Sequence, residues 1–119
     1  MKAVFDTNIL IDYLKGVDEA ETELARYRER YVSAVTWMEV LIGSRSEPET
    51  DVIEMFLREF KVIDISRRVS REAIDVRRAH RLRLPDAIIW ASARVESALL
   101  VTRNRKDFPA DDPGVRIPY

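Results

Sequence analysis

Acidic side chains stand where the strand-like apolar runs of this chain end. Asp6 directly follows the first run, Glu39 follows the second and Asp107 a later one, and Asp86 lies at the start of an apolar, helix-like stretch. In a parallel sheet the carboxyl ends of the strands lie at one edge, so these acids are expected to surround a single crevice. Carboxylates at close range raise one another's pKa unless a cation binds between them. Oxygen ligands suit Mg²⁺ or Mn²⁺, and such a site predicts metal-assisted attack of water on a phosphodiester.

Each acid also has a purely structural interpretation. Asp6 can cap the helix that follows it, and Glu39 stands three residues after Thr36, at the spacing of a capping box. Asp86 would gain from the dipole of a first helical turn, and Asp107 can be an ordinary turn residue. Taken singly, the capping interpretations of Asp6 and Glu39 are the stronger. The functional prediction therefore depends on the fold bringing the acids together.

Composition excludes several kinds of site. The chain has no cysteine and His80 is its only histidine, so thiolate zinc sites, cysteine nucleophiles and clusters of imidazoles within one chain are excluded. The absence of cysteine fits a reducing cytoplasm. No apolar run approaches the roughly 20 residues that a membrane span requires, so we expect a cytoplasmic protein without a membrane anchor.

Charge is unevenly divided although the net charge is only −1. Residues 61–119 carry 13 basic and 8 acidic side chains, and seven arginines fall between Arg67 and Arg83. A positive face of this kind can attract phosphate backbones. A solvated helix face explains the same arginines without any function, and taken alone it is the better explanation.

The pattern of elements is that of an α/β fold, because apolar runs alternate with longer helical stretches. The runs that predict strands are 2–5, 32–35, 62–65, 99–102 and 115–117, the last at an edge of the sheet. Helices are predicted over 8–14, 19–30, 36–43 and 49–60, then after Ser66 or Ser70, and from Pro85 onward. Because no linker or repeat interrupts the pattern, residues 1–119 are expected to form one domain.

Four segments in chain order carry a family resemblance. They are residues 4–12 (VFDTNILID), 33–43 (SAVTWMEVLIG), 82–89 (LRLPDAII) and 100–108 (LVTRNRKDF). Together they resemble the PIN-domain ribonucleases, and most closely the VapC-type toxins of bacterial toxin–antitoxin pairs. The resemblance implies a three-layer α/β/α fold around a mainly parallel sheet of about five strands. It also implies an endoribonuclease, dependent on Mg²⁺ or Mn²⁺, whose in-line attack by water on RNA leaves 5′-phosphate and 3′-hydroxyl ends.

By the same resemblance, Asp6, Glu39 and Asp86 form the acidic, metal-binding core of the site. Many relatives carry an aspartate where this chain has Asn104. Asn104 can still offer a carbonyl oxygen and Asp107 can supply the missing charge, so either residue, or both, is expected to complete the catalytic and metal-binding set.

A second group of residues is expected to contact the substrate or to orient water, namely Thr7, Asn8, Thr102, Arg103 and Asn104. The arginines between 67 and 83 are further candidates for holding the RNA backbone. Asp12 matches a common residue of the family's opening segment, but its place at the far end of a short helix predicts exposure to solvent. Trp90 is expected to be a core residue.

The partners implied by the resemblance are RNA, in single-stranded or loop regions, a VapB-like antitoxin and a second copy of the chain. Two alternatives remain open. Asn104 motivates a catalytically weakened PIN-like module that only binds RNA or protein. A receiver-like signalling domain also places acids at strand ends, but it needs adjacent acids near the first strand, and Phe5-Asp6-Thr7 lacks them.

Overall fold

A parallel sheet of five short strands forms the centre of the molecule, which the computed structural model describes over residues 1–119. In chain order the elements are β1 (Lys2–Phe5), α1 (Thr7–Leu14), α2 (Asp18–Ala25), β2 (Glu29–Ser33), α3 (Ala34–Ile42), α4 (Glu47–Leu57), β3 (Lys61–Ile63), α5 (Arg67–His80), α6 (Leu84–Val95), β4 (Leu99–Val101) and β5 (Val115–Arg116). The strand order is β3-β2-β1-β4-β5, and every neighbouring pair is parallel. The predicted α/β class and the edge position of the last strand are confirmed.

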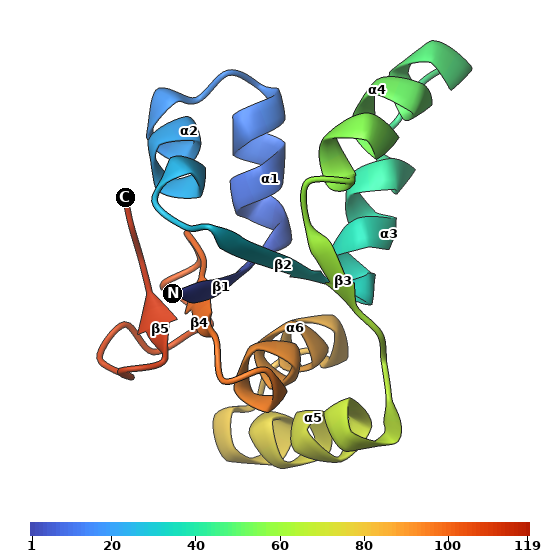
Figure 1. Ribbon diagram of the computed structural model, residues 1–119. Helices are drawn as coiled ribbons and strands as arrows, with labels where there is room; N and C mark the ends of the chain where they lie inside the picture. The colour runs from blue at the N-terminus through green and yellow to red at the C-terminus, as the bar shows by residue number, and fades with distance from the viewer.

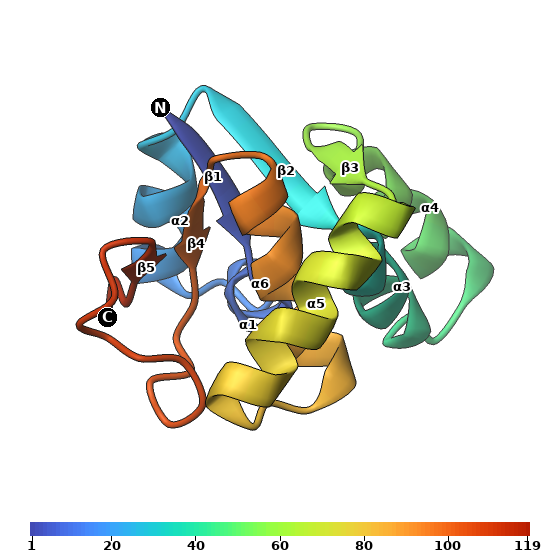
Figure 2. The ribbon, with the colours of Figure 1, turned by 90° about the horizontal axis from the view of Figure 1, so that it is seen from below.

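Helices cover both faces of the sheet, which gives three layers (Figure 1). Helices α1 to α4 lie on one face, and α5 and α6 pack together across the other, as the second view also shows (Figure 2). Each face has its own core. Phe5, Ile9 and Leu57 belong to the core under α1 to α4, and Val4 and Trp90 belong to the core under α5 and α6. Alternating side chains of β1 therefore serve the two layers in turn.

The predicted helix over 19–30 is wrong in its second half. Helix α2 ends at Ala25, and residues from Glu29 form β2, which pairs with β1 and β3. Tyr27, placed on the helix by the prediction, is buried beneath the sheet with its ring edge-on to Phe5 at 5.6 Å. The charged residues of this segment favour helix locally, but pairing on both sides of β2 and burial of Tyr27 outweigh that preference.

The sequence predicted the starts of α5 and α6 correctly, but not the start of α3. Ser66 caps α5 by accepting a hydrogen bond from the Val69 N–H at 3.1 Å, and Pro85 lies in the first turn of α6, as expected. Helix α3, however, begins at Ala34, because Ser33 ends β2 and accepts from the Val35 N–H. The sequence prediction carried the strand through Val35, since β-branched residues favour strands. None of the helices has the length and apolar character that a membrane-spanning segment requires.

Candidate active site

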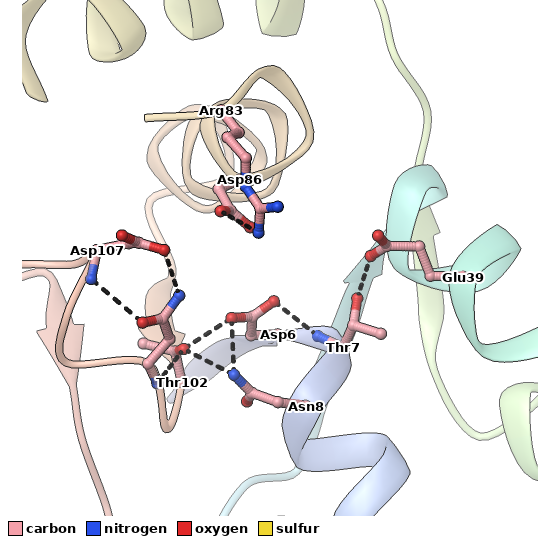
Figure 3. A network of polar contacts seen from close by, with 9 residues as sticks. Asp6, Thr7, Asn8, Glu39, Arg83, Asp86, Thr102 and Asp107 are labelled. Atoms are coloured by element: carbon pink, nitrogen blue, oxygen red, sulfur yellow. Dashed lines mark hydrogen bonds and ion pairs between the residues drawn. The ribbon is translucent and has the colours of Figure 1, made fainter. Parts of the chain in front are cut away.

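Asp6 joins the end of β1 to the start of α1 and is buried, with 4% of its surface exposed. One carboxylate oxygen, Oδ1, accepts from the Thr7 N–H at 2.8 Å, so the capping role is confirmed. The other, Oδ2, accepts from the Thr102 hydroxyl at 2.7 Å and the Asn8 amide at 3.3 Å (Figure 3). The same carboxylate therefore caps a helix and faces the end of β4, because β1 and β4 are neighbours.

The pKa of Asp6 is raised from 3.8 to about 6, chiefly by burial. Hydrogen bonds from Thr102 and Thr7 oppose this rise, and the negative charges of Asp86 and Glu39 add to it. The charges of Asp86 and Glu39, two of the acids that the sequence assigned to the same crevice, thus reach the Asp6 carboxylate.

Glu39 is held by a residue of α1 and not by its own helix. Because Ser33 caps α3, the predicted capping box between Thr36 and Glu39 does not form. Glu39 instead accepts a 2.6 Å hydrogen bond from the Thr7 hydroxyl (Figure 3). That hydroxyl lies 3.0 Å from the hydroxyl of Thr36. The earlier start of α3 moves Glu39 beyond the first turn, and its side chain then reaches toward α1.

Asp86 lies in the first turn of α6, and its Oδ2 atom is buried without a hydrogen-bond partner. The nearest cation is the Arg83 guanidinium, 3.8 Å away, on a side chain that is 83% exposed. Burial raises the pKa of Asp86; the Arg83 charge opposes the rise, and the charges of Asp107 and Glu39 reinforce it. An unsatisfied buried carboxylate oxygen is costly, so this atom is a feature that a bound cation would satisfy.

Asn104 and Asp107 bind each other across the loop that follows β4. The Asn104 amide donates to Asp107 Oδ2 at 2.9 Å, and Asn104 Oδ1 accepts from the Asp107 N–H at 3.2 Å. Both polar groups of the Asn104 side chain are therefore engaged, whereas the charge of Asp107 acts on Asp86. Of the two residues left open by the sequence, Asp107 is the better placed to add charge to the crevice, and Asn104 orients it.

The acids do not form a ready-made metal cage, since no three of them stand where they could hold one ion together. The donor set nevertheless fits a hard divalent cation. It consists of carboxylate oxygens, and one of them is buried without a hydrogen-bond partner. The charges that act on Asp86 are all negative apart from Arg83. Binding an ion between them requires rotation of the carboxylate side chains.

Arg103, which the sequence assigned to substrate contact, is held by α1. Its guanidinium binds Asp12 through two hydrogen bonds, Nε to Oδ2 at 2.7 Å and Nη2 to Oδ1 at 3.2 Å. The expectation that Asp12 faces solvent is wrong, because only 8% of its surface is exposed and Tyr119 donates a further hydrogen bond to it. Nothing local to Asp12 indicates this contact, whose partners lie 91 and 107 residues along the chain.

Comparison with known families decides what kind of fold carries this crevice. A family model described as the PIN domain matches residues 3–110. The chain belongs to the PIN domain family. No curated protein matches the chain. The resemblance carried by the four sequence segments is confirmed, and the receiver-like alternative is wrong.

Three solved structures similar to this PIN domain are a toxin–antitoxin complex and two VapBC complexes. One from Klebsiella pneumoniae is 41% identical over 99% of this chain and 98% of that one, with a TM-score of 0.93. VapBC2 from Rickettsia felis, bound to a promoter DNA fragment, is 23% identical over 97% and 96%, with a TM-score of 0.80. DNA-bound VapBC from Salmonella typhimurium is 23% identical over 98% and 96%, with a TM-score of 0.82. The last two show the shared fold.

A groove next to the acidic crevice runs between α1, α3 and α4 of this PIN domain and has a volume of about 560 Å³. Apolar side chains line much of it, including Ile11, Leu14 and Val52, of which Val52 is 63% exposed. Glu39 lies on its wall. The groove and the crevice therefore share a residue, so an occupant of one lies beside the other.

Proposed function

We propose that this PIN domain is an endoribonuclease, dependent on Mg²⁺ or Mn²⁺, that serves as the toxin of a toxin–antitoxin pair. PIN domains are nucleases that generally use divalent cations. The observation that carries the proposal is the buried Oδ2 of Asp86, which has no hydrogen-bond partner. It lies in a crevice where burial, and to a smaller extent the charges of Asp86 and Glu39, raise the pKa of Asp6. Ionised carboxylates in such a crevice destabilise the folded chain when no cation is bound, and they would bind a cation favourably.

We assign the cation to Asp6, Glu39, Asp86 and Asp107. When bound, it would polarise the phosphoryl oxygens of RNA and lower the pKa of water for in-line attack. The chain's own groups hold the carboxylates in place for this. Thr102 and Asn8 fix Oδ2 of Asp6.

Two further contacts hold the carboxylates of Glu39 and Asp107. The Thr7 hydroxyl holds Glu39 through its 2.6 Å hydrogen bond. Asn104 holds Asp107 through the pair of hydrogen bonds between them. Thr7 and Asn104 thus act in this proposal through the carboxylates that they position.

RNA binding is assigned to exposed arginines near the crevice. Arg83 stands beside Asp86, where its guanidinium can meet a phosphate that approaches the site. Of the seven arginines between 67 and 83, only Arg83 lies within 4.0 Å of a carboxylate. The others extend a positive face along α5 that can hold the backbone of single-stranded or looped RNA.

Two protein partners complete the proposal, which places the protein in the cytoplasm. A VapB-like antitoxin is favoured because the structural relatives are toxin–antitoxin complexes, and the apolar groove beside Glu39 offers it a surface. A homodimer is favoured by exposed apolar side chains on α3 and β3, namely Trp37, Met38 and Val62. Light scattering of the purified chain, alone and with a VapB-like antitoxin, tests both partners.

The activity is tested by incubating single-stranded RNA with the purified protein in Mg²⁺, in Mn²⁺ and in EDTA. Asp6→Asn and Asp86→Asn should each abolish cleavage, and Asp111→Asn, which changes an exposed acid outside the crevice, should not. The products should carry 5′-phosphates. Equal cleavage by wild type and Asp6→Asn would refute the enzyme hypothesis. Binding of RNA without cleavage would favour the alternative of a catalytically weakened PIN-like module.

A further inference from the structure

A carboxylate, a guanidinium and a phenol meet behind the candidate active site. Asp12 accepts two hydrogen bonds from Arg103, at 2.7 and 3.2 Å, and one from the Tyr119 hydroxyl at 2.7 Å. Paired hydrogen bonds between a guanidinium and a carboxylate are strong and fix both groups in orientation. Burial raises the pKa of Asp12, but the hydrogen bonds from Arg103 and Tyr119 outweigh it, so the carboxylate stays ionised.

Arg103 is flanked in the chain by two residues of the site, Thr102 and Asn104. The Thr102 hydroxyl donates to Asp6 and accepts from the Asn104 N–H at 3.0 Å. Asn104 in turn holds Asp107. Any shift of the Arg103 backbone therefore moves the hydroxyl that touches Asp6 and the side chain that orients Asp107.

Helix α1 binds Arg103 at two points. Asn8 and Asp12 are four residues apart and so lie on one face of the helix. Asn8 accepts from the backbone N–H of Arg103 at 3.2 Å, and Asp12 holds its side chain. The start of α1 is also the segment that carries Asp6 and Thr7. The two contacts thus fix the loop after β4 against the helix whose first turn builds the site.

We propose that Asp12, Arg103 and Tyr119 are positioning residues that hold the 102–107 loop against α1, so that Thr102 meets Asp6 and Asp107 faces Asp86. Arg103 acts in this way and not by contacting RNA. The inference rests on the proposed nuclease function for its kinetic test, but the geometry of the loop can be measured without it.

The chain contains a matched control for a merely structural role. Glu23 accepts two hydrogen bonds from Arg116, at 2.6 and 3.0 Å, and one from the Tyr27 hydroxyl at 3.0 Å. This is the same combination of carboxylate, guanidinium and phenol, and the carboxylate is also buried, with 3% of its surface exposed against 8% for Asp12. It joins α2 to β5, and its side chains make no hydrogen bond to the residues assigned to the site. The one link is through the backbone, where the Arg116 carbonyl accepts from the Thr102 N–H at 3.0 Å, and Glu23→Gln leaves this bond in place. Loss of this second network should affect stability alone.

The kinetic test compares Asp12→Asn, Arg103→Gln and their double variant with Glu23→Gln. We expect each single change in the Asp12 network to lower kcat by roughly 10- to 100-fold, as loss of an orienting partner commonly does, with KM nearly unchanged. The double variant should be no worse than the more damaged single variant, because both remove one interaction. Glu23→Gln should keep the wild-type kcat at temperatures where it is folded.

A contact between Arg103 and RNA gives a different result and would overturn the proposal. Arg103→Gln would then raise KM and reduce its salt dependence, whereas Asp12→Asn, which frees the arginine, would leave kcat intact. Arg103→Lys separates the two further. It keeps the charge that RNA needs but loses the paired hydrogen bonds, so we expect it to be as impaired in kcat as Arg103→Gln.

Amide hydrogen exchange provides a readout that needs neither metal nor activity. In metal-free protein, Asp12→Asn should speed exchange across residues 102–107, and Glu23→Gln should not. Tyr119→Phe serves as the second variant in case Asp12→Asn fails to fold. It removes one hydrogen bond to Asp12 and keeps the ion pair with Arg103, so it should speed exchange across the same residues by a smaller factor. Unchanged exchange in these variants would refute the inference. If wild type cleaves no RNA, the proposed function is refuted. The exchange experiment still tests whether Asp12, Arg103 and Tyr119 position the loop.

Discussion

Replacing Asp6 by asparagine should make the metal-free protein more stable at neutral pH, although it should destroy the active site. Asp6 is 4% exposed, and burial is the main cause of its raised pKa, with the charges of Asp86 and Glu39 adding to it. Asparagine has the same shape and no charge. The substitution therefore removes the unfavourable ionisation of a buried acid and keeps most of the packing around it.

The pKa sets the size and the sign of this effect. The folded chain binds the Asp6 proton more tightly than the unfolded chain, with a pKa of about 6 against 3.8. The free energy of unfolding of wild type therefore falls as pH rises from about 4 to about 6 and stays low above that range. Each pKa unit corresponds to about 1.4 kcal/mol, so the full shift is worth about 3 kcal/mol. Because the unfolded carboxyl is already more than half ionised at pH 4, Asp6→Asn should gain about 2.4 kcal/mol on wild type between pH 4 and pH 7.5.

Urea unfolding in EDTA, followed by circular dichroism at intervals from pH 4 to pH 7.5, measures this gap. The asparagine NH₂ group must face one of the donors that bind Asp6 in wild type, namely Thr7, Asn8 or Thr102, and this lowers the stability of the variant by a fixed amount. That amount does not vary with pH, so it cancels when only the change in stability with pH is compared. Asp111→Asn serves as the control and should track wild type throughout. Adding Mg²⁺ at pH 7.5 should then stabilise wild type but not Asp6→Asn, by about 2.7 kcal/mol at a hundredfold excess over Kd.

Stability curves for wild type and Asp6→Asn that run parallel with pH would refute this reasoning. Such a result would mean that Asp6 ionises in the folded protein as easily as in water, and so that its burial and its acidic neighbours do not act as the structure indicates. A gap that widens toward low pH would contradict the sign, and would place a cationic group beside Asp6 instead.

Three further changes test the site and the core. Asp86→Asn should abolish Mg²⁺-dependent cleavage while leaving the circular dichroism spectrum unchanged, because it removes one charge from a side chain at a helix start. Thr7→Val should lower kcat by roughly tenfold by releasing Glu39, and a variant with wild-type kcat would argue against that contact. Trp90→Ala should cost about 3–5 kcal/mol in urea unfolding, since its ring is 1% exposed; a cost below about 1 kcal/mol would contradict its core position.

Much of the fold could be predicted from local patterns. Strands at residues 2–5, 62–65 and 99–102 lie within a residue or two of their observed ends, because apolar runs of that length between helices suit a buried parallel sheet. Ser66 and Pro85 marked their helices through backbone chemistry that acts within a few residues. The segment after Ala25 was misassigned, since its charges favour helix and only pairing with two neighbouring strands makes it a strand.

In the site, too, contacts between neighbours in the chain could be predicted, and contacts between distant residues could not. Asp6 as a helix cap was predictable, because the cap involves the adjacent Thr7. The wrong capping box at Glu39 followed from a helix start misplaced by two residues. Whether Asn104 or Asp107 joins the crevice was not decidable from their order, since both lie in one loop and only their mutual hydrogen bonds reveal which side chain is already engaged.

The sequence by itself determined the order of strands, helices and acids, and through the match over residues 3–110 the family to which the chain belongs. The tertiary structure decided the environment of those acids. It supplied the burial that raises the pKa of Asp6, the Asp86 oxygen that has no hydrogen-bond partner, and the pairing of Asp12 with Arg103 across 91 residues. The physical reason is that a helix cap or an apolar run depends on near neighbours in the chain, whereas desolvation and long-range hydrogen bonds depend on groups that only folding brings together.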